Sequence, residues 1–449
     1  MTQFNNPLMS YAELTLPLPC SKDLWFARTA EEFKIRYFEL GLVERGKQPP
    51  SLGDLLRNFC DLADNHHRID VQFALSIFLH GFWSLIWEYR QLNSVFQSAI
   101  QGAPNSNILF LGSRRADLCT ILLNFQQATQ GWHELTAQEN IVLHLLLLNL
   151  HVSMDDLQLF SGKEGEEQAR RVYPTLQRWS DTPEARQALW HAGQILRQAK
   201  MFPPGHLKDF YAIAVHHAAL CIWTYGVVVK ASKLGQPRGN LDPGQGSAAG
   251  GGRRRQRRHE NGNDHNSNNG PPLAHHAQPP PPSASASHGG GGPPPVYLPQ
   301  PQSSDGFPPS LPLRVYLDGD EYSAMVRGYI EFGSRPQPIT HQVRNVRRNN
   351  GFNHYVPTIR GVVRHHHHAQ QPAVVVQTES SLDQPAACME IAREILRANF
   401  VADAVISMGA GADDGEGNNS QQHPMMPPIS ENIMGVLNQL ALAASGVGL

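Results

Sequence analysis

The composition of this 449-residue chain changes sharply near residue 232, and this change limits where a folded core can form. The segment 1–232 is rich in Leu, Phe, Trp and Ala and is long enough to bury one sizeable core. From about 233 to 380 the chain carries Gly, Pro, Ser, Asn and His runs such as QPPPPSASAS. Such runs bury too little apolar surface to offset the entropy lost on ordering. We therefore expect a folded domain over 10–232, a disordered low-complexity linker over 233–380, and an acidic tail over 381–449 with two weak amphipathic helices.

Helix signals repeat through the segment 10–232, and no alternating strand pattern of useful length occurs there. Thr136 and Glu139 form a TAQE capping box, and Thr182 followed by Pro183 is a strong helix start. The aromatic segment 69–97 is apolar on nearly all sides, which indicates a central helix. The sequence therefore predicts an all-α bundle. Its expected helices begin at residue 30 and then cover about 51–64, 69–97, 115–129, 136–149, 154–160, 165–179 with a break near Pro174, 183–201 and 207–231.

Neither disulfides nor membrane spans are indicated. Five cysteines lie far apart with no paired spacing, which favours a reducing compartment: Cys20, Cys60, Cys119, Cys221 and Cys388. The segment 212–231 is long enough to span a membrane, but it is Ala-rich and contains His216 and His217, which fits a buried helix better. The start of the chain also lacks the layout of a signal peptide. We expect a soluble protein with no membrane partner.

Charge is distributed unevenly along the chain. The net charge is −2 over the segment 1–232, +7 over 233–370 and −7 over 371–449. The basic excess includes a run that can engage the acidic grooves of import receptors: Arg253, Arg254, Arg255, Arg257 and Arg258. The alternative is a solvated charge run that serves solubility. Phosphate attraction alone carries no base information, so this run does not predict sequence-specific DNA binding.

The last helical segment carries an apolar stripe within an acidic tail. The stripe consists of Ile433, Met434, Leu437 and Leu440. Such a stripe can fold into the hydrophobic groove of a partner protein. The alternative is that the segment 431–444 docks on the protein's own bundle, and the sequence leaves both interpretations open.

Catalytic and metal-binding patterns are incomplete in this chain. Asp155 and Asp156 resemble part of the aspartate-rich motif of helical isoprenoid enzymes, but no third carboxylate and no second acidic cluster follow. Carboxylates at a helix N-terminus are the simpler interpretation. The run 161–163 (SGK) lacks the upstream glycine of a phosphate-binding loop. The run 365–368 is four histidines with no second ligand group, and no Cys-x-x-Cys occurs. We assign no catalytic residue, no metal ligand and no cofactor to this chain, and we expect it not to be an enzyme.

Three blocks of the segment 1–232 resemble one protein family. The first is TLPLPCSKDLWFARTAEEFKIRYFEL, in which Pro17 and Pro19 prevent a helix and Trp25 and Phe26 are expected to anchor the segment in a core. The second is EARQALWHAGQILRQAK, residues 184–200, which precedes a proline break. The third is HLKDFYAIAVHHAALCIWTYGVV, residues 206–228. Together these blocks are similar to the fungal-specific transcription factor domain, the regulatory domain of fungal zinc-finger transcription factors.

The resemblance implies a role in regulating DNA-templated transcription in the nucleus. It implies contacts with transcriptional co-regulator proteins, and a homodimer is a further partner hypothesis. Members of the family bind zinc and DNA through a module upstream of this domain. That module is missing here, so we expect no zinc or DNA binding by this chain itself. Two rival hypotheses are a helical enzyme with an apolar pocket and a helical scaffold unconnected with transcription.

Overall fold

The N-terminal part of the computed structural model contains four short helices, the first three of which have a side-chain N-cap. They are α1 (Lys22–Trp25), α2 (Ala30–Glu39), α3 (Leu52–Arg57) and α4 (Cys60–Asp64). The Thr29 hydroxyl accepts a hydrogen bond from the backbone N–H of Glu32, so α2 begins at the predicted residue. The helix expected over 51–64 is instead interrupted at Asn58, where the backbone becomes extended. The structure describes residues 13–42, 48–99, 106–130, 135–235, 312–320, 322–334, 355–366, 374–409 and 426–446.

The expected aromatic anchor of the first block is wrong. Trp25 and Phe26 are 75% and 73% exposed, and the residue that is buried beside them is Leu24. The side chains of α2 are also all at least partly exposed. The segment that contains α1 and α2 is attached through the buried Leu24 and through backbone contacts such as the hydrogen bond from Ser21 N–H to the Arg68 carbonyl.

Seven further helices follow, most of them at or near the positions that the sequence predicts. They are α5 (Val71–Ala99), α6 (Ser106–Thr129), α7 (Ala137–His151), α8 (Met154–Phe160), α9 (Glu166–Ser180), α10 (Pro183–Lys200) and α11 (Phe210–Gly235). The predicted capping box is present, because the Thr136 hydroxyl accepts from Glu139 N–H and the Glu139 carboxylate accepts from Thr136 N–H. Thr182 likewise caps α10. The predicted break in α9 is wrong, since Pro174 lies inside a continuous helix.

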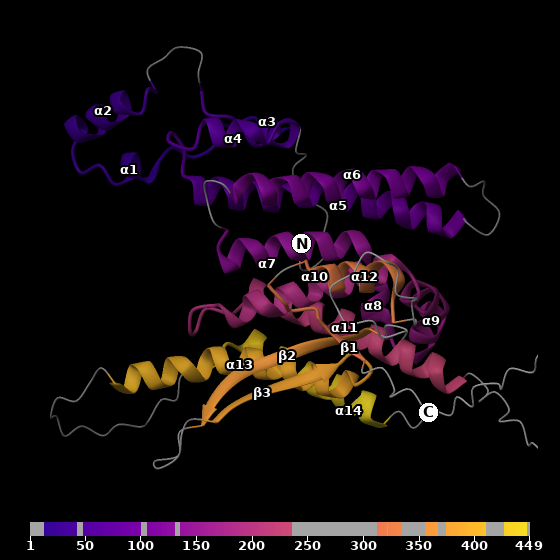
Figure 1. Ribbon diagram of the computed structural model, residues 1–449. Coiled ribbons are helices and arrows are strands. Elements are labelled where there is room, and N and C mark those ends of the chain that lie inside the picture. Colours follow the sequence, from indigo (N-terminus) through magenta and orange to yellow (C-terminus); the bar gives the residue numbers. More distant parts are fainter. Residues whose placement is uncertain are drawn as a thin grey trace, which may run out of the picture. The chain divides into compact units, whose positions relative to one another are not determined.

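Helix α7 connects two hydrophobic clusters, as Figure 1 shows by its place between α5 and α10. One face of α7, with Ile141, Leu145 and Leu148, packs with α10 and α11. The other face, which includes Leu143 and Leu146, packs with α5 and α6. A helix that is apolar on all sides satisfies both neighbours at once. The all-α prediction is confirmed for this part of the chain.

Helix α11 is the one element among the described residues that is long and apolar enough to cross a membrane. That test concerns residues Phe210–Leu234, and 78% of the most apolar window is buried inside the protein. Core helices of soluble proteins commonly pass the same test, so the burial explains the composition without a membrane.

The C-terminal part adds a small sheet and three further helices. The sheet has the order β1 (Leu313–Tyr316), β2 (Tyr355–His366) and β3 (Val374–Ser381), with β1 parallel and β3 antiparallel to β2. The helices are α12 (Ala324–Phe332), α13 (Pro385–Gly409) and α14 (Pro428–Gly446). The sheet was not predicted, because its strands lie within a stretch whose Gly, Pro, Asn and His runs indicated a disordered linker. Within the expected linker 233–380, the described residues are therefore ordered.

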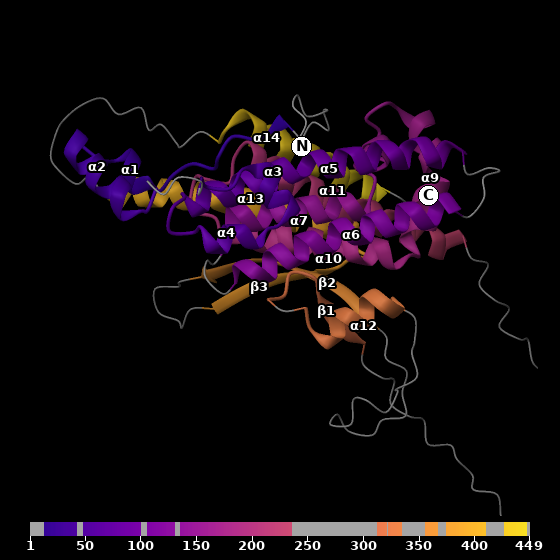
Figure 2. The ribbon, with the colours of Figure 1, turned by 90° about the horizontal axis from the view of Figure 1, so that it is seen from above.

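Two glycines let the C-terminal part pack closely on the helices. A Cβ at Gly193 in α10 would overlap the carbonyl of Leu317, and one at Gly226 in α11 would lie 2.5 Å from the carbonyl oxygen of Leu382. Polar contacts reinforce the first junction, since Lys200 Nζ donates to Asp318 Oδ2 over 2.6 Å. Figure 2 shows the sheet and α12 beside the helices at this junction.

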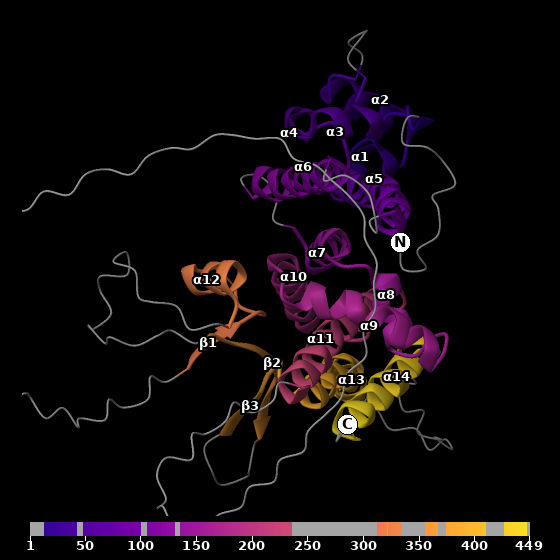
Figure 3. The same cartoon turned by 90° about the vertical axis from the view of Figure 1, so that its right-hand side faces the viewer.

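The apolar stripe of α14 is packed inside the protein. Ile433, Leu437 and Leu440 are buried in the same cluster as α11, and Met434 packs against it. Trp223 Nε1 in α11 donates to the Leu440 carbonyl over 2.9 Å. Figure 3 shows α13 and α14 beside α11. The structure therefore has the stripe docked on the chain's own helices, which is the alternative stated above. The expected boundary near residue 232 differs too, because the core continues into α13 and α14.

Candidate functional site

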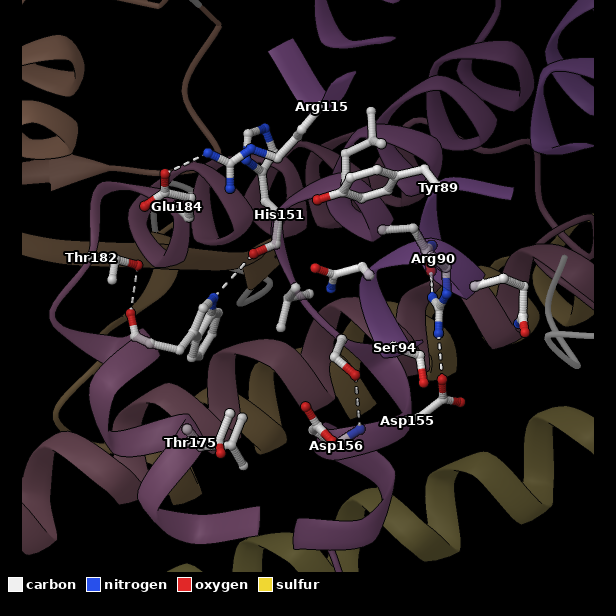
Figure 4. A pocket seen from close by; sticks show the side chains of 18 of the residues that line it. Tyr89, Arg90, Ser94, Arg115, His151, Asp155, Asp156, Thr175, Thr182 and Glu184 are labelled. Atoms are coloured by element: carbon white, nitrogen blue, oxygen red, sulfur yellow. Dashed lines mark hydrogen bonds and ion pairs between the residues drawn. The ribbon is translucent and has the colours of Figure 1, made fainter. Parts of the chain in front are cut away.

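A pocket of about 540 Å³ lies where the ends of α7, α8, α9 and α10 meet the sides of α5 and α6 (Figure 4). Helices α5, α6 and α7 form one part of its wall, and α8, α9 and the start of α10 form the other. The sequence places polar residues here because helix ends expose backbone groups that require caps. Both Ser153, which caps α8, and Thr182, which caps α10, belong to the lining.

Arg90 of α5 lies at one end of the pocket and is held by two oxygen atoms. Its guanidinium donates to Asn149 Oδ1 over 2.5 Å and to Asp155 Oδ2 over 2.6 Å. The Asn149 amide is itself fixed, because its Nδ2 donates to the Leu145 carbonyl within α7. Burial lowers the pKa of Arg90, and the Asp155 carboxylate opposes that shift. This arrangement joins α5, α7 and α8 through one charged side chain.

Asp155 and Asp156 occupy the first turn of α8, as the simpler interpretation of the sequence predicts. The Asp155 side chain is 62% exposed and pairs with Arg90. Burial raises the pKa of Asp156, whose backbone N–H donates to the Ser153 hydroxyl. Among the described residues, no group of three or more His, Cys, Asp or Glu side chains converges as a metal site would require. The acidic pair of the isoprenoid-type hypothesis therefore lacks its second cluster in this part of the chain.

A second ion pair lies at the opposite end of the pocket. Arg115 of α6 donates to Glu184 Oε1 in the first turn of α10 over 2.6 Å. Burial raises the pKa of Glu184, but a hydrogen bond from its own backbone and the Arg115 guanidinium outweigh that effect, and the net pKa is lowered. Both arginines of the pocket thus have carboxylate partners already.

His151 ends α7 between the two ion pairs. Its Nδ1 is buried and makes no hydrogen bond within the described residues, and its Nε2 lies 3.6 Å from Cys119 Sγ. Burial lowers its pKa to about 4, so the imidazole is neutral at pH 7. Burial also raises the pKa of the Cys119 thiol to about 11, so this contact joins a neutral thiol and a neutral ring.

Tyr89 lies near His151 and is only 8% exposed. Its side chain lines the pocket, and burial raises the pKa of its hydroxyl. Figure 4 shows it directed toward the side where Arg115 and His151 lie.

A second cavity of about 890 Å³ shares His151 with the pocket. It lies between α6, α7, α10 and the residues after β1. On its wall, His144 Nδ1 and His191 Nδ1 are 3.2 Å apart, so one of these nitrogens donates and the other accepts. Burial lowers the pKa of His144 to about 4, which keeps it neutral at pH 7.

The residues that the sequence predicted as sites are not among the described residues that line this pocket. The stripe of α14 lies in the core away from the pocket, and the basic run Arg253 to Arg258 falls outside the described residues. The histidine run 365–368 is described only at its first two residues, as the end of β2. The sequence reasoning missed Arg90, Arg115 and Tyr89. No single signal marked the arginines, because Glu88 lies near Arg90 in α5, and Arg114 and Asp117 lie near Arg115 in α6.

Comparison with known proteins gives matches to transcription factors from three fungi. A transcription factor of Zymoseptoria tritici is 27% identical over an alignment of 268 residues, which covers 52% of this chain and 27% of that protein. Transcription factor PfmaH of Pestalotiopsis fici is 23% identical over 49% of this chain and 24% of its own length. Transcription factor 1 of Elsinoe fawcettii is 22% identical over 50% of this chain and 25% of its own length.

These alignments cover about a quarter of each relative's length. No protein-family model and no solved structure matches the chain. The relatives agree with the resemblance of the three sequence blocks. About half of this chain is therefore a region similar to fungal transcription factors.

Proposed function

We propose that this chain is the regulatory portion of a fungal zinc-finger transcription factor. The observation that carries the proposal is its similarity to three fungal proteins named as transcription factors. A binding role fits the described part of the helical bundle, whose pocket holds two arginine–carboxylate ion pairs. The helical-enzyme alternative is not favoured, since two of the pocket's carboxylates, Asp155 and Glu184, are paired with Arg90 and Arg115.

Zinc and DNA binding belong in this proposal to a module outside the chain. The described residues do not fit a zinc site, because no three metal-ligating side chains converge among them. The five cysteines are free and widely separated, and Cys221 and Cys388 are buried. The partners we propose are transcriptional co-regulator proteins, a second copy of this chain in a homodimer, and DNA bound through that module.

The expected location is the nucleus, with the basic run Arg253 to Arg258 as the candidate import signal. Replacing its five arginines by alanine in a fluorescent fusion of the full chain should shift the signal toward the cytoplasm. An unchanged nuclear signal would exclude the run from import and leave the family inference intact.

A partner role for the stripe of α14 stays a prediction, and it now requires α14 to leave the core. Ile433, Met434, Leu437 and Leu440 would become available only after the Trp223 contact to Leu440 is broken. A segment that must first undock binds with modest net affinity, because part of its interaction energy offsets the lost packing.

A tethering assay tests the regulatory function. The full chain would be fused to an unrelated DNA-binding module upstream of a reporter gene in a fungal host. We expect reporter output to change, in either direction, relative to the module alone. Unchanged output, with chromatin immunoprecipitation showing the fusion on the reporter, would contradict the proposal.

A further inference from the structure

The second cavity, of about 890 Å³, follows one face of α10. Trp190, Gln194, Arg197 and Met201 all line it, and they recur at intervals of three or four residues, which places them on one stripe of the helix. The other walls come from α6, α7 and the residues that follow β1. Its volume lies in the range of small-molecule sites.

Among the described residues of this lining, two side chains are charged at pH 7, Arg197 and Asp320. The lining histidines are neutral, because burial lowers the pKa of His144 and His151 to about 4 and also lowers that of His191. The charge balance of the cavity therefore depends on one arginine and one carboxylate.

The carboxylate offsets the arginine only weakly. Arg197 Nη2 lies 2.9 Å from Asp320 Oδ1, but the Asp320 side chain is 81% exposed, whereas the Arg197 side chain is 28% exposed. Water screens an ion pair whose carboxylate is so exposed. The Arg197 charge also acts inside the cavity, because it adds to burial in lowering the pKa of His144. An anion in the cavity would therefore meet a cation that a solvated carboxylate holds only loosely.

The cavity also leaves apolar surface uncovered. Met201 is 62% exposed and Leu123 is 49% exposed, and both line it. On the stripe of α10, Trp190 and Met201 lie on either side of Arg197, about 10 Å and 6 Å away along the helix axis. The apolar lining as a whole consists of Leu123, Leu135, Ala137, Leu147, Trp190 and Met201. A ligand with an apolar body would remove part of this surface from water.

We propose that the second cavity binds a small organic monocarboxylate, with its carboxylate on Arg197 and its apolar body against Trp190, Leu123 and Met201. A carboxylate fits the planar guanidinium, which can donate two parallel hydrogen bonds to the two oxygens. A single cation suits a single negative charge, whereas a phosphate dianion would keep one charge unbalanced in a partly buried site. A role of the ligand as an effector of transcription rests on the proposed function, whereas the binding does not.

Direct titration of the purified full chain tests the binding. The probes are 4-phenylbutyrate, with an aromatic body, and octanoate, with an aliphatic one. Their primary amides are the neutral comparators, and 4-phenylbutylamine is the cationic one. We expect at least one of the two anions to bind saturably in calorimetry and to raise the melting temperature. Its amide and the amine should bind at least about tenfold more weakly, because the charge-assisted hydrogen bonds to Arg197 are lost.

Two charge variants locate the carboxylate. Arg197→Gln should weaken binding of the anion at least about tenfold and leave binding of the amide nearly unchanged. Arg170→Gln is the matched control, because Arg170 also pairs with an exposed carboxylate, that of Glu166, but lies on α9. Asp320→Asn should tighten binding of the anion by about two- to fivefold, since it removes the competing carboxylate from Arg197. A purely structural role of the Arg197–Asp320 pair would not produce this gain.

A third variant locates the apolar body. Leu123→Ser changes a half-exposed side chain of the lining, so the fold should be retained. It should weaken binding of the anion and of its amide by the same factor, because both carry the same apolar body.

Four outcomes would overturn the proposal: no saturable binding of either anion, binding of the amide or the amine as tight as that of the anion, equal effects of Arg197→Gln and Arg170→Gln, or weaker binding of the anion by Asp320→Asn. None of these outcomes bears on the tethering assay. Failure of the ligand site and failure of the regulatory function are therefore distinguishable.

Discussion

Replacing Gly193 by alanine should destabilise the protein, although alanine is the better helix former. Gly193 lies inside α10, and in a free helix the change would stabilise by about 1 kcal/mol. Here the added Cβ overlaps backbone atoms of Leu317, which cannot move aside as a flexible side chain does. Overpacking of this kind costs about 1–3 kcal/mol.

The same displacement would disturb the hydrogen bonds that hold this turn. Gln194 Nε2 donates to the carbonyls of Leu317 over 3.0 Å and Gly319 over 2.9 Å. Losing one of them costs about 1 kcal/mol, so we expect a net destabilisation of about 2 kcal/mol once the gain in helix propensity is subtracted.

Gly112→Ala in α6 is the matched control, because an added Cβ there meets no atom within 4 Å. It should stabilise the protein by about 1 kcal/mol. Denaturant unfolding of both variants, with limited proteolysis between α12 and α13, measures the difference. If Gly193→Ala stabilised the protein as much as Gly112→Ala does, α10 would not carry the C-terminal part against this face, and the reasoning would be refuted.

Three further changes test other parts of the structure. Leu437→Ala removes a fully buried side chain of α14, so it should lower the free energy of unfolding by about 2–5 kcal/mol and cause new proteolysis in α14. Leu442→Ala changes an exposed side chain of the same helix and should cost far less. Equal effects of the two variants would contradict the docking of α14. Asp155→Asn should lower the free energy of unfolding by under about 1 kcal/mol, because the Asp155 side chain is mostly exposed. Arg90→Met leaves Asn149 Oδ1 without its donor and should lower it by about 1–3 kcal/mol. Denaturant midpoints of the two variants decide whether this order holds. Burial lowers the pKa of His144 and His216 to about 4 and of His217 to about 3. In the unfolded chain these rings take up protons near pH 6.5, whereas in the folded protein they stay neutral until pH approaches 4. The free energy of unfolding therefore decreases as pH falls from about 6.5 toward 4. Melting temperatures measured from pH 7 to pH 4 should therefore decrease, and a His217→Gln variant should lose less over that range; a flat profile would contradict the burial of these rings.

The sequence predicted the helices best where caps and periodicity agree. The capping box at Thr136 and the Thr182–Pro183 start are local signals, and each lies at the residue that the structure shows. Trp25 was predicted poorly, because an aromatic residue alone does not reveal whether a neighbour covers it. Pro174 was also misjudged, since packing around α9 maintains the helix despite one missing hydrogen bond.

The sheet and the pocket depend on contacts between distant parts of the sequence. Strand β1 pairs with β2, which follows it only after α12 and a further stretch of chain, as Leu313 opposite Tyr355 shows, and no local pattern specifies that pairing. The pocket brings Arg90 and Asp155 together from different helices. A sequence predicts that such residues exist on helices, but only the packing of α5, α7 and α8 makes them neighbours.

The C-terminal part, from β1 through α14, packs on α10 and α11, and this packing has a consequence for how the gene can change. The sequence between Gly235 and Leu313 connects two pieces of one core. Doubling the length of a connecting chain costs only about 0.6 kcal/mol in closure entropy. Tracts such as GGGG and PPPP can therefore lengthen or shorten by replication slippage with little effect on the stability of the core. Cutting the chain near residue 232 would instead remove α13 and α14 and expose the face of α11 that carries Trp223.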